Sequence, residues 1–457
     1  MTNKSSSKNQ GKSGTEVSSE FVLECLQAEQ LGDGMLFSEL HRGKFVYNKT
    51  TQEWLSWQGH HWKIDEMDRA VGAVERVALR YGEEYTLVGK KIAAAKDDEE
   101  KKWLEYRRGQ LGKRIKTLRK SSGRKNCIEF AHTGSTESSL AITSQQLDAD
   151  PWLLGLENGV MDLRTGELRP GRYDDWISKA CPVTWAGIDV PCNEWERFLW
   201  ESLEHESTIN FLRRWVGYCL TALTTEQRFL ILSGAGRNGK GIFCETILGL
   251  MGNYAGPIST ETLLDQGRGN RAGGTTPEIM ALQGRRLATA SESDENRRFS
   301  PSKLKWFTGQ DTLVGRRPYD RYETSFQPTH KLMMLTNNDP NAPADDFAFW
   351  DRILKVDWPY KFIVNPRRND EKRRDPNLYE KIQAELPGVL AWAVRGCLEW
   401  QHDGLNPPGG VKDSVSEYQR EQDIGQDFID ECCFVSNAGA ESDIRTSAGD
   451  LYAAFKD

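Results

Sequence analysis

RFLILSGAGRNGKGIFCETILGL, residues 228–250, places a short apolar run, a glycine-rich loop and a helical pattern in immediate succession. Phe229 to Leu232 has the length and composition of a buried strand, and the apolar residues from Ile242 to Leu250 recur at helical spacing. Between them stands G-x-x-x-x-G-K, ending in Gly239 and Lys240. In this context the pattern predicts a phosphate-binding loop, because glycine lets backbone N–H groups turn toward an anion at the positive end of a helix.

The loop also predicts individual contacts. We expect Lys240 to reach the outer phosphates of a nucleotide. The residues expected to bind this cofactor are Gly234, Gly236, Asn238, Gly239, Lys240, Gly241 and Ile242. Gly241 departs from the pattern, since the residue after the lysine is usually a Ser or Thr whose hydroxyl ligates magnesium. The alternative is a glycine-rich turn that binds nothing.

Length and composition limit the possible classes of protein. The 457 residues suffice for two to four domains, and fifteen tryptophans exclude a largely disordered chain. The sequence contains no run of eighteen apolar residues, so it predicts no membrane span. Residues 1–20 lack the apolar core of a signal peptide and predict a disordered tail. Nine scattered cysteines without a C-x-x-C pair predict reduced thiols, and therefore a cytoplasmic protein without a zinc site.

The charge distribution is uneven. The net charge of −7 argues against a protein that coats DNA with its whole surface. From Tyr106 to Lys125, however, nine Lys or Arg residues occur without a single acid. This run is either a phosphate-contacting surface or a solvated helix face balanced by acidic neighbours such as Asp97 to Glu100, and the sequence favours neither.

Periodicity gives an outline of the remaining chain. Upstream of the loop it predicts a hairpin at 54–65, a charged helical region at 69–120, a polar break at 121–126, a turn-rich β-hairpin within 148–185 and a helical unit at 195–223. Downstream it predicts strands at 286–290, 331–336 and 353–356, a helix at 300–307, and helical segments at 378–400 and after 410. Strands alternating with helices predict an α/β domain with a largely parallel sheet.

Polar residues at the ends of these strands indicate phosphoryl-transfer chemistry. Glu292 follows the strand at 286–290 and is the first choice for binding magnesium and orienting an attacking water, with Asp294 and Glu295 as alternates. Asn337 follows the strand at 331–336 and is expected to contact the γ-phosphate or that water. Arg352 precedes the strand at 353–356 and is a candidate arginine finger, a residue often supplied by a neighbouring subunit.

A basic, aromatic segment lies between these strands. Residues 314–322, VGRRPYDRY, predict the tip of a hairpin. Arginines interleaved with tyrosines suit the backbone and bases of single-stranded nucleic acid, and a solvated hairpin is the alternative. The residues expected to bind DNA are Arg316, Arg317, Tyr319 and Arg321.

Taken together, the segments GAGRNGKG, GRRLATASES, LKWFTGQDTLVGRRPY, FQPTHKLMMLTNN and DDFAFWDRILKVDWPYKF resemble, in order and spacing, the superfamily 3 helicases. More narrowly, they resemble the helicase part of phage and plasmid primase-helicases, which are related to the poxvirus primase-ATPase. LGDGMLFSELHRGKFVYNKTTQEWLSWQGHHWKID and LLGLENGVMDLRTGELRPGRYDDWISKACPVTW resemble the accessory domain that precedes the helicase in that family. The resemblance covers roughly Gln30 to Asp457.

The resemblance implies an α/β fold with an AAA+ type P-loop ATPase domain at 228–365, built on a central, mainly parallel sheet. It implies an α+β accessory domain at 21–192, a helical collar or linker at 193–227, and a helical or winged-helix-like region at 366–457. That last region resembles a winged helix that stops early, which predicts a truncated chain or a short variant. We expect no catalytic primase domain, and we expect Asp148 and Asp150, although spaced as D-x-D, to be structural.

The implied activity is that of an ATP-dependent DNA helicase, a ring-forming and typically hexameric enzyme that moves 3′ to 5′ in the replication of a phage, prophage or plasmid. Its cofactors are ATP and Mg²⁺. Its partners are single-stranded or forked DNA, further copies of itself, and a separate primase or polymerase. By position, Lys240, Glu292, Asn337 and Arg352 match the catalytic residues of that family. Two alternatives remain: a nucleotide-switched replication initiator or loader scaffold, which Gly241 keeps open, and a small-molecule kinase.

Overall fold

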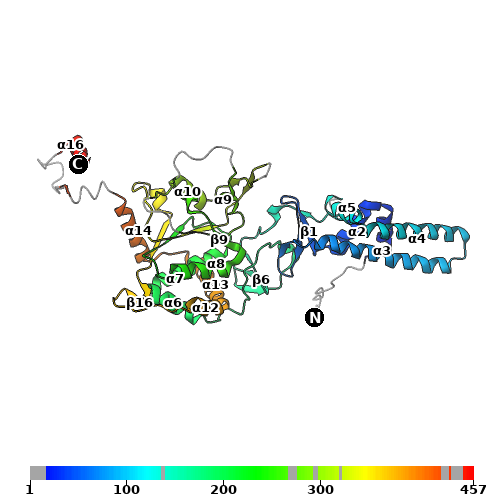
Figure 1. The fold of residues 1–457 in the computed structure, drawn as a ribbon, viewed down its shortest axis with the longest axis horizontal. Helices are drawn as coiled ribbons and strands as arrows, with labels where there is room; N and C mark the ends of the chain where they lie inside the picture. Colours follow the sequence, from blue (N-terminus) through cyan, green and yellow to red (C-terminus); the bar gives the residue numbers. More distant parts are fainter. Residues whose placement is uncertain are drawn as a thin grey trace, which may run out of the picture. The chain divides into compact units, whose positions relative to one another are not determined.

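The computed structural model describes residues 17–134, 139–265, 275–291, 297–318, 322–423, 432–433 and 446–456. The chain forms two compact units. Unit 1 comprises Met1–Ala149 with Pro170–Lys179, and unit 2 comprises Asp150–Arg169 with Ala180–Asp457. Figure 1 shows both units as ribbons coloured along the chain.

Unit 1 packs helices beside a small sheet. Its helices are α1 (Ser19–Gln27), α2 (Glu29–His41), α3 (Arg69–Ala94), α4 (Asp98–Leu118) and α5 (Ser121–Thr133). Its strands, in the sheet order β3-β2-β1-β4, are β1 (Phe45–Asn48), β2 (Glu53–Trp57), β3 (Trp62–Ile64) and β4 (Ala141–Ile142). The antiparallel pairing of β2 with β3 confirms the predicted hairpin at 54–65.

Two local predictions for unit 1 are wrong. The tail predicted over 1–20 ends earlier, because Val17 is buried and α1 begins at Ser19 after the Ser18 side chain accepts a hydrogen bond from Phe21 N. Residues 1–16 lie outside the described residues. The polar break predicted at 121–126 is helical, since α5 begins at Ser121. Gly123 permits a tight α4–α5 turn, because a Cβ there would lie 2.1 Å from Thr117 O.

Unit 2 is built on a five-stranded, wholly parallel sheet in the order β14-β8-β13-β10-β9. The strands are β8 (Phe229–Ser233), β9 (Ala255–Pro257), β10 (Leu287–Ser291), β13 (Lys331–Thr336) and β14 (Ile353–Asp357). The predictions of strands at 229–232, 286–290, 331–336 and 353–356, and of a largely parallel sheet, are therefore confirmed. β8, the strand that leads into the glycine loop, lies between β13 and β14.

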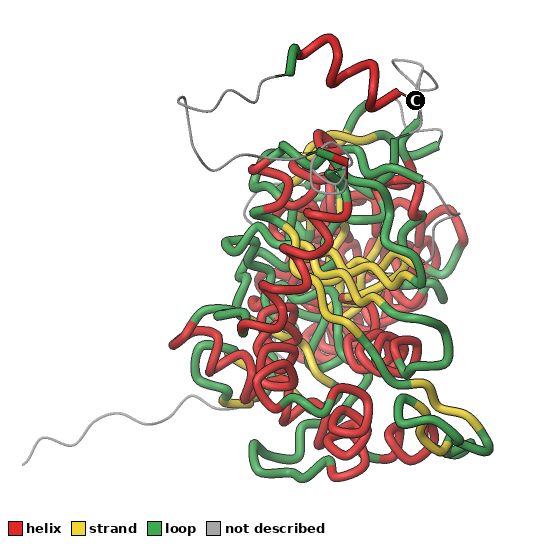
Figure 2. Tube along the Cα trace, turned by 90° about the vertical axis from the view of Figure 1, so that its left-hand side faces the viewer, coloured by secondary structure: helices red, strands yellow, loops and turns green. Residues whose placement is uncertain are grey.

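Alternate residues of these strands face two separate cores, as expected for a sheet buried on both sides. Leu230 and Leu232 of β8 pack in the core that includes α6 (Asn193–Leu203), α7 (Glu206–Leu220), α8 (Lys240–Met251) and α13 (Leu386–Asp403). Phe229 and Ile231 face the core that includes α9 (Pro277–Met280), α10 (Pro301–Thr308), α11 (Phe347–Trp350) and α14 (Gly409–Glu421). Figure 2 shows the strands of this sheet as a layer among the helices.

Smaller elements complete unit 2. They are β5 (Leu153–Leu156), β6 (Gly159–Asp162), β7 (Glu167–Arg169), β11 (Leu313–Gly315), β12 (Thr324–Phe326), β15 (Lys361–Ile363), β16 (Glu371–Arg373), α12 (Leu378–Ala384) and α16 (Ala448–Lys456). β5, β6 and β7 form an antiparallel sheet, which confirms the β-hairpin expected within 148–185.

Two buried basic side chains bind carbonyls at the carboxyl end of α7, and burial lowers the pKa of one of them, Lys331, to about 7. The guanidinium of Arg286 donates to Leu220 O and, over 2.7 Å, to Leu153 O, and it lies 4.3 Å from the centre of the Tyr254 ring. The ammonium of Lys331 donates to Thr221 O. Positive charge is favourable at this end of a helix, where backbone carbonyls lack partners within the helix. These contacts therefore hold the end of α7 against the amino ends of β10 and β13.

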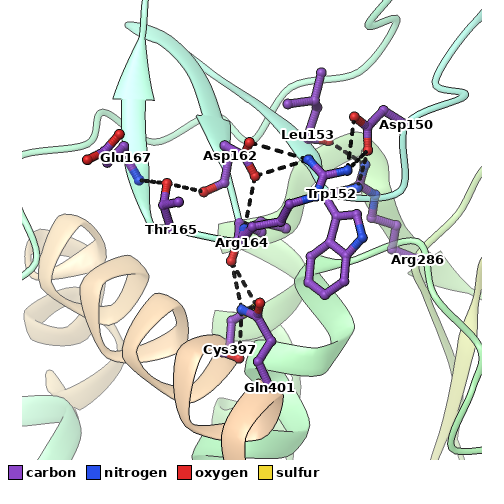
Figure 3. A network of polar contacts seen from close by, with 11 residues as sticks. Asp150, Trp152, Leu153, Asp162, Arg164, Thr165, Glu167, Arg286, Cys397 and Gln401 are labelled. Atoms are coloured by element: carbon purple, nitrogen blue, oxygen red, sulfur yellow. Dashed lines mark hydrogen bonds and ion pairs between the residues drawn. The ribbon is translucent and has the colours of Figure 1, made fainter.

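Both carboxylates of the D-x-D pair make structural contacts. Asp148 accepts hydrogen bonds from Ser178 N and Oγ within unit 1. In unit 2, Asp150 caps Trp152 N and binds the guanidinium of Arg164, which also contacts Asp162 (Figure 3). Both carboxylates are therefore engaged by protein groups, as a structural role would require. Among the described residues, no group of three His, Cys, Asp or Glu side chains could hold a metal ion.

All nine cysteines are free, and seven of them are buried. Burial raises the pKa of Cys25, Cys181 and Cys219 to about 12, so these thiols stay protonated near neutral pH. In the part of the chain that the structure describes, no helix is both long and apolar enough to cross a bilayer.

Buried histidines predict that the fold is sensitive to acid. Burial lowers the pKa of His330 in unit 2 to about 3 and that of His41 in unit 1 to about 4. Unfolded chain takes up these protons near pH 6.5, whereas folded chain does not, so stability is complete above pH 6.5 and decreases as the pH falls toward 4. We expect each histidine to remove about 2 kcal/mol of stability by pH 5. Denaturant unfolding at several pH values measures this loss.

The His330→Met variant isolates one contribution. The free energy of unfolding of unit 2 should decrease less steeply below pH 6.5 in this variant. His402→Met alters a side chain that is 87% exposed, and it should leave this pH dependence unchanged. An unchanged slope for His330→Met would contradict the assignment.

Candidate active site

The loop between β8 and α8 depends on two glycines with positive φ. Gly234 has a φ of 144° and Gly239 a φ of 96°. A Cβ at Gly234 would lie 2.5 Å from Trp358 O, and one at Gly239 would lie 2.8 Å from Cε2 of Phe198. No L-residue with a side chain fits either position without strain. The loop therefore passes close to β14 and α6 while its backbone turns toward the carboxyl edge of the sheet.

Lys240 lies where this loop meets the neighbouring strand. Its ammonium donates to Gly234 O and lies 3.3 Å from Asn337 Oδ1. The contact follows from the sheet, because Thr336 at the end of β13 pairs with Ser233 at the end of β8. The structure thus brings together Lys240 and Asn337, two predicted site residues that are far apart in the sequence. They meet at the carboxyl edge of a parallel sheet, the usual ligand-binding edge of such sheets.

Asn238 holds the loop in shape. It is 3% exposed, and its Nδ2 donates to Trp358 O over 3.3 Å while its Oδ1 accepts from Lys240 N over 3.4 Å. On the other side of the loop, Phe362 N donates to Arg237 O over 2.8 Å. Asn238, predicted as a cofactor contact, therefore supports the loop from inside.

Gly241 faces open space. An added Cβ there would meet no heavy atom within 4 Å, and the residue has no positive φ. A hydroxyl side chain would fit at this position, but the protein lacks one. Nearby, Ser233 Oγ donates to Asp339 Oδ1 over 2.7 Å, and Lys355 binds Asp339 Oδ2 over 3.1 Å. Neither Ser233 nor Asp339 thus replaces the missing hydroxyl in this arrangement.

A cavity of about 470 Å³ adjoins the loop, a volume suited to a small ligand. Asn238, Gly239, Gly241 and Ile242 form one side of it. The other side was not predicted from the sequence and is lined by Phe198, Phe362, Arg374, Asp375, Leu378 and Tyr379. These residues come from α6, the β15–β16 segment and α12, so no local motif could have signalled them.

Polar contacts fix the β15–β16 segment to α6. Lys372 Nζ lies 2.5 Å from both Glu201 O and Glu204 Oε1, and Tyr360 donates its hydroxyl proton to Glu204. These hydrogen bonds lower the pKa of Glu204, so its carboxylate stays charged near neutral pH. The cavity wall formed by Phe362 and Arg374 is therefore attached to the helix that carries Phe198.

Several predicted residues cannot be placed. Glu292, with its alternates Asp294 and Glu295, lies outside the described residues, as do Tyr319 and Arg321. The strands on either side of the basic tip, β11 and β12, pair antiparallel, which confirms the hairpin. At its base, Arg316 N donates to Thr276 Oγ1 and Arg317 Nη2 donates to Gln283 Oε1 over 2.6 Å.

Arg352 lies at the opposite edge of the sheet. Its carbonyl accepts from Phe229 N at the start of β8, and its guanidinium donates to Ala348 O over 2.7 Å and to Gln227 Oε1 over 3.3 Å. The five residues of β14 separate it from the carboxyl edge by roughly 16 Å, at about 3.3 Å per residue. Arg352 therefore cannot reach the loop of its own chain without a large rearrangement.

Two family models match the chain. Residues 34–204 match the family model "D5 N terminal like", and residues 232–352 match a "Family of unknown function (DUF5906)". The second match begins within β8 and ends at Arg352, so its range includes the glycine loop and Asn337.

Curated relatives narrow the class. "Putative helicase L207/L206" of Acanthamoeba polyphaga mimivirus is 25% identical over 85% of this chain and 42% of its own length. "Putative helicase 022R" of Frog virus 3 is 24% identical over 68% of this chain and 39% of its own length. "Putative primase C962R" of African swine fever virus is 25% identical over 51% of this chain and 25% of its own length. The chain is a homologue of the D5-like primase-helicases. It spans about two fifths or less of the length of these relatives.

A solved structure gives a weaker likeness. The apo structure of the NrS-1 C terminal region aligns with a TM-score of 0.42 and 12% identity over 61% of each chain. At this level of similarity the alignment adds nothing to the description of the site.

The open position at Gly241 leads to a prediction. Gly241→Thr should fold normally and supply the hydroxyl that commonly ligates magnesium beside such a lysine. We expect the Mg²⁺ concentration for half-maximal nucleotide hydrolysis to fall several-fold. Gly241→Ala is the matched control, since it adds a Cβ without a hydroxyl. Equal magnesium requirements for the two variants would contradict the prediction.

Proposed function

We propose that this chain is an ATP-dependent DNA helicase of AAA+ type that acts in replication, as a ring of identical subunits moving 3′ to 5′ on one DNA strand. The names of its homologues support a helicase or primase role in viral replication. The phage, prophage or plasmid setting rests only on the resemblance of its motifs. ATP is the proposed fuel, and single-stranded or forked DNA is the proposed track.

One observation carries the proposal. Lys240 lies between the glycine loop and Asn337 at the carboxyl edge of the sheet, and its chain neighbours Gly239 and Gly241 line a largely apolar cavity. Lysine and backbone N–H groups suit phosphates, while the cavity suits a flat base between Phe198, Leu378 and Tyr379. Both halves of a nucleoside triphosphate thus find a matching surface.

In the proposed mechanism each side chain has a limited task. Lys240 exchanges its contact with Gly234 O for the outer phosphates, and Asn337 positions the γ-phosphate or the attacking water. Glu292 orients that water. Arg352 of the partner subunit stabilises the charge that develops on the transferred phosphoryl group, a role that fits its distance from the loop of its own chain. Turnover moves the hairpin that begins at Arg316 and Arg317 along the DNA strand.

Magnesium would be held by the phosphates, by water and by Glu292, because Gly241 offers no hydroxyl. When bound, it neutralises charge on the β- and γ-phosphates. The glycine loop and Lys240 fit the phosphates that would carry this ion, so the chain suits the metal despite the substitution.

The second candidate is a nucleotide-switched initiator or loader that binds DNA without processive unwinding. The specific observation in its favour is Gly241, since a site with weakened magnesium binding can bind nucleotide yet hydrolyse it slowly. DNA-stimulated turnover separates the candidates, because a scaffold should show little.

Strand displacement on a forked duplex tests the function. The unaltered chain should displace the strand when ATP and Mg²⁺ are present, and Lys240→Ala should lower both turnover and displacement by at least a hundredfold, because it removes the charge that pairs with the phosphates. Lys303→Ala, a lysine on α10 that donates to Leu264 O, is a control. Unwinding by Lys240→Ala at the rate of the unaltered chain would refute the proposal.

The base cavity makes a separate prediction. Tyr379 is 39% exposed and lines the cavity, so Tyr379→Ala should fold and should weaken ATP binding by about ten-fold through lost ring contact. The affinity for inorganic triphosphate should not change, because that ligand has no base. Equal losses for both ligands would show that the base lies elsewhere.

A further inference from the structure

α4 of unit 1 carries a stripe of exposed residues, here called the α4 stripe, which consists of Lys102, Tyr106, Gly109, Lys113 and Lys116. The helix packs into unit 1 through Leu104, Leu111 and Leu118, which are all buried. At 3.6 residues per turn, the stripe lies on the side of the helix opposite these leucines and extends for about 21 Å along it. It is therefore the fully outward face of the α3–α4 pair, whose long helices lie side by side in Figure 1.

The basic residues of this region divide into two groups. Arg114 forms an ion pair with the buried Asp33, and Arg119 and Arg124 both bind Glu75. These three arginines hold α2, α3, α4 and α5 together. The lysines of the α4 stripe, in contrast, form no ion pair with any acid of the described residues.

The acidic first turn of α4 does not neutralise the stripe. Asp97 accepts from Glu100 N and caps the helix, and acids in this turn are favourable because they oppose the positive end of the helix dipole. The sequence alone left open whether these acids balance the basic run. In the structure Asp97 caps the helix. Among the described residues, neither the acids of this turn nor Glu105, which lies between Lys102 and Tyr106 in the sequence, forms an ion pair with a lysine of the stripe.

Aromatic and glycine residues add features that solvation alone does not require. Tyr106 is 68% exposed and Trp103 is 51% exposed, and the guanidinium of Arg107 lies 3.5 Å from the centre of the Trp103 ring. Gly109 stands in the middle of the stripe, and a Cβ there would meet nothing within 4 Å. A glycine inside a helix costs up to about 1 kcal/mol relative to alanine, and no neighbour in unit 1 requires it.

We infer that the α4 stripe binds single-stranded DNA. Lys102, Lys113 and Lys116 contact the phosphates of the strand, Gly109 lets the backbone of the strand approach the helix closely, and Tyr106, with Trp103 and Arg107 beside it, stacks against bases. Aromatic residues interleaved with cations are the usual surface for single-stranded nucleic acid. An acidic protein partner would require only the positive charge of this surface and would not explain its exposed aromatic residues. The inference rests on the proposed function only in taking DNA as the ligand, and it requires no hydrolysis.

Binding of a labelled 30-nucleotide single strand to the full chain, without nucleotide and at several salt concentrations, tests the inference. The variant Lys102→Ala/Lys113→Ala/Lys116→Ala should bind the strand at least ten-fold more weakly. The slope of log affinity against log salt concentration should become shallower by about 2, because each lost phosphate contact removes about 0.7 from that slope. A control variant changes three exposed lysines outside α4, Lys44→Ala/Lys63→Ala/Lys412→Ala, and should bind like the unaltered chain.

A matched pair of glycine variants tests the close approach. Gly109→Glu places a carboxylate inside the stripe and should weaken binding several-fold. Gly72→Glu makes the same change on α3, where a Cβ also meets nothing within 4 Å, and should have no effect. All variants should keep the basal ATP turnover of the unaltered chain.

The inference would be overturned if both α4 variants bound DNA with normal affinity and salt dependence, a result that would point to a protein partner for the stripe. It would also be overturned if the α4 variants and their controls lost binding equally. A loss of binding seen only with duplex DNA of the same sequence would contradict it as well. If Arg317→Ala abolished DNA binding while the α4 variants bound normally, the inference would fail and the proposed function would stand. No DNA binding by the unaltered chain would contradict both.

Discussion

Everything in unit 2 depends on the close approach of one backbone loop to its neighbours. Gly234 and Gly239 adopt positive φ where a Cβ would collide with Trp358 O or with the Phe198 ring. Because no side chain fits there, the loop can lie against both β14 and α6 and still present its amides at the edge of the sheet. The same contact joins the loop to the cavity, since Phe198 packs against Gly239 and also lines the cavity. A larger residue at Gly239 would therefore disturb both the loop and the cavity wall.

The order of the strands then determines what surrounds the loop. β8 lies between β13 and β14, so Asn337 emerges beside Lys240, while Asp339 links Ser233 of β8 to Lys355 of β14. The loop after β13 is also held by α14, because Tyr418 donates to Pro340 O and Gln422 accepts from Ala342 N. A shift of Asn337 would therefore change the contacts between this loop and α14, the helix that begins the C-terminal part of the chain. Arg352 lies at the opposite, amino edge, where its guanidinium donates to Ala348 O and Gln227 Oε1.

Much of this arrangement could be predicted from the sequence, but not all of it. Strands and helices of unit 2 follow from apolar periodicity, and the loop from its glycines and Lys240, because these signals are local. The residues Phe198, Phe362 and Tyr379 could not be predicted, since three distant segments meet only after folding. The break predicted at 121–126 was wrong because polar residues at the start of a helix resemble those of a loop, and α5 begins at Ser121. The basic run at 106–125 stayed ambiguous until the structure separated the arginines paired with Asp33 and Glu75 from the lysines that face outward.

The central claim is that a nucleotide bound at Lys240 is hydrolysed with the help of Arg352 from a second copy of the chain. The most direct test mixes two inactive variants, Lys240→Ala and Arg352→Ala, and measures ATP turnover. Each variant alone should be inactive, with Arg352→Ala still binding nucleotide. In a mixture, some interfaces combine an intact lysine with an intact arginine, so turnover should return. Full turnover by Arg352→Ala alone, or no recovery in mixtures shown to assemble, would contradict the account.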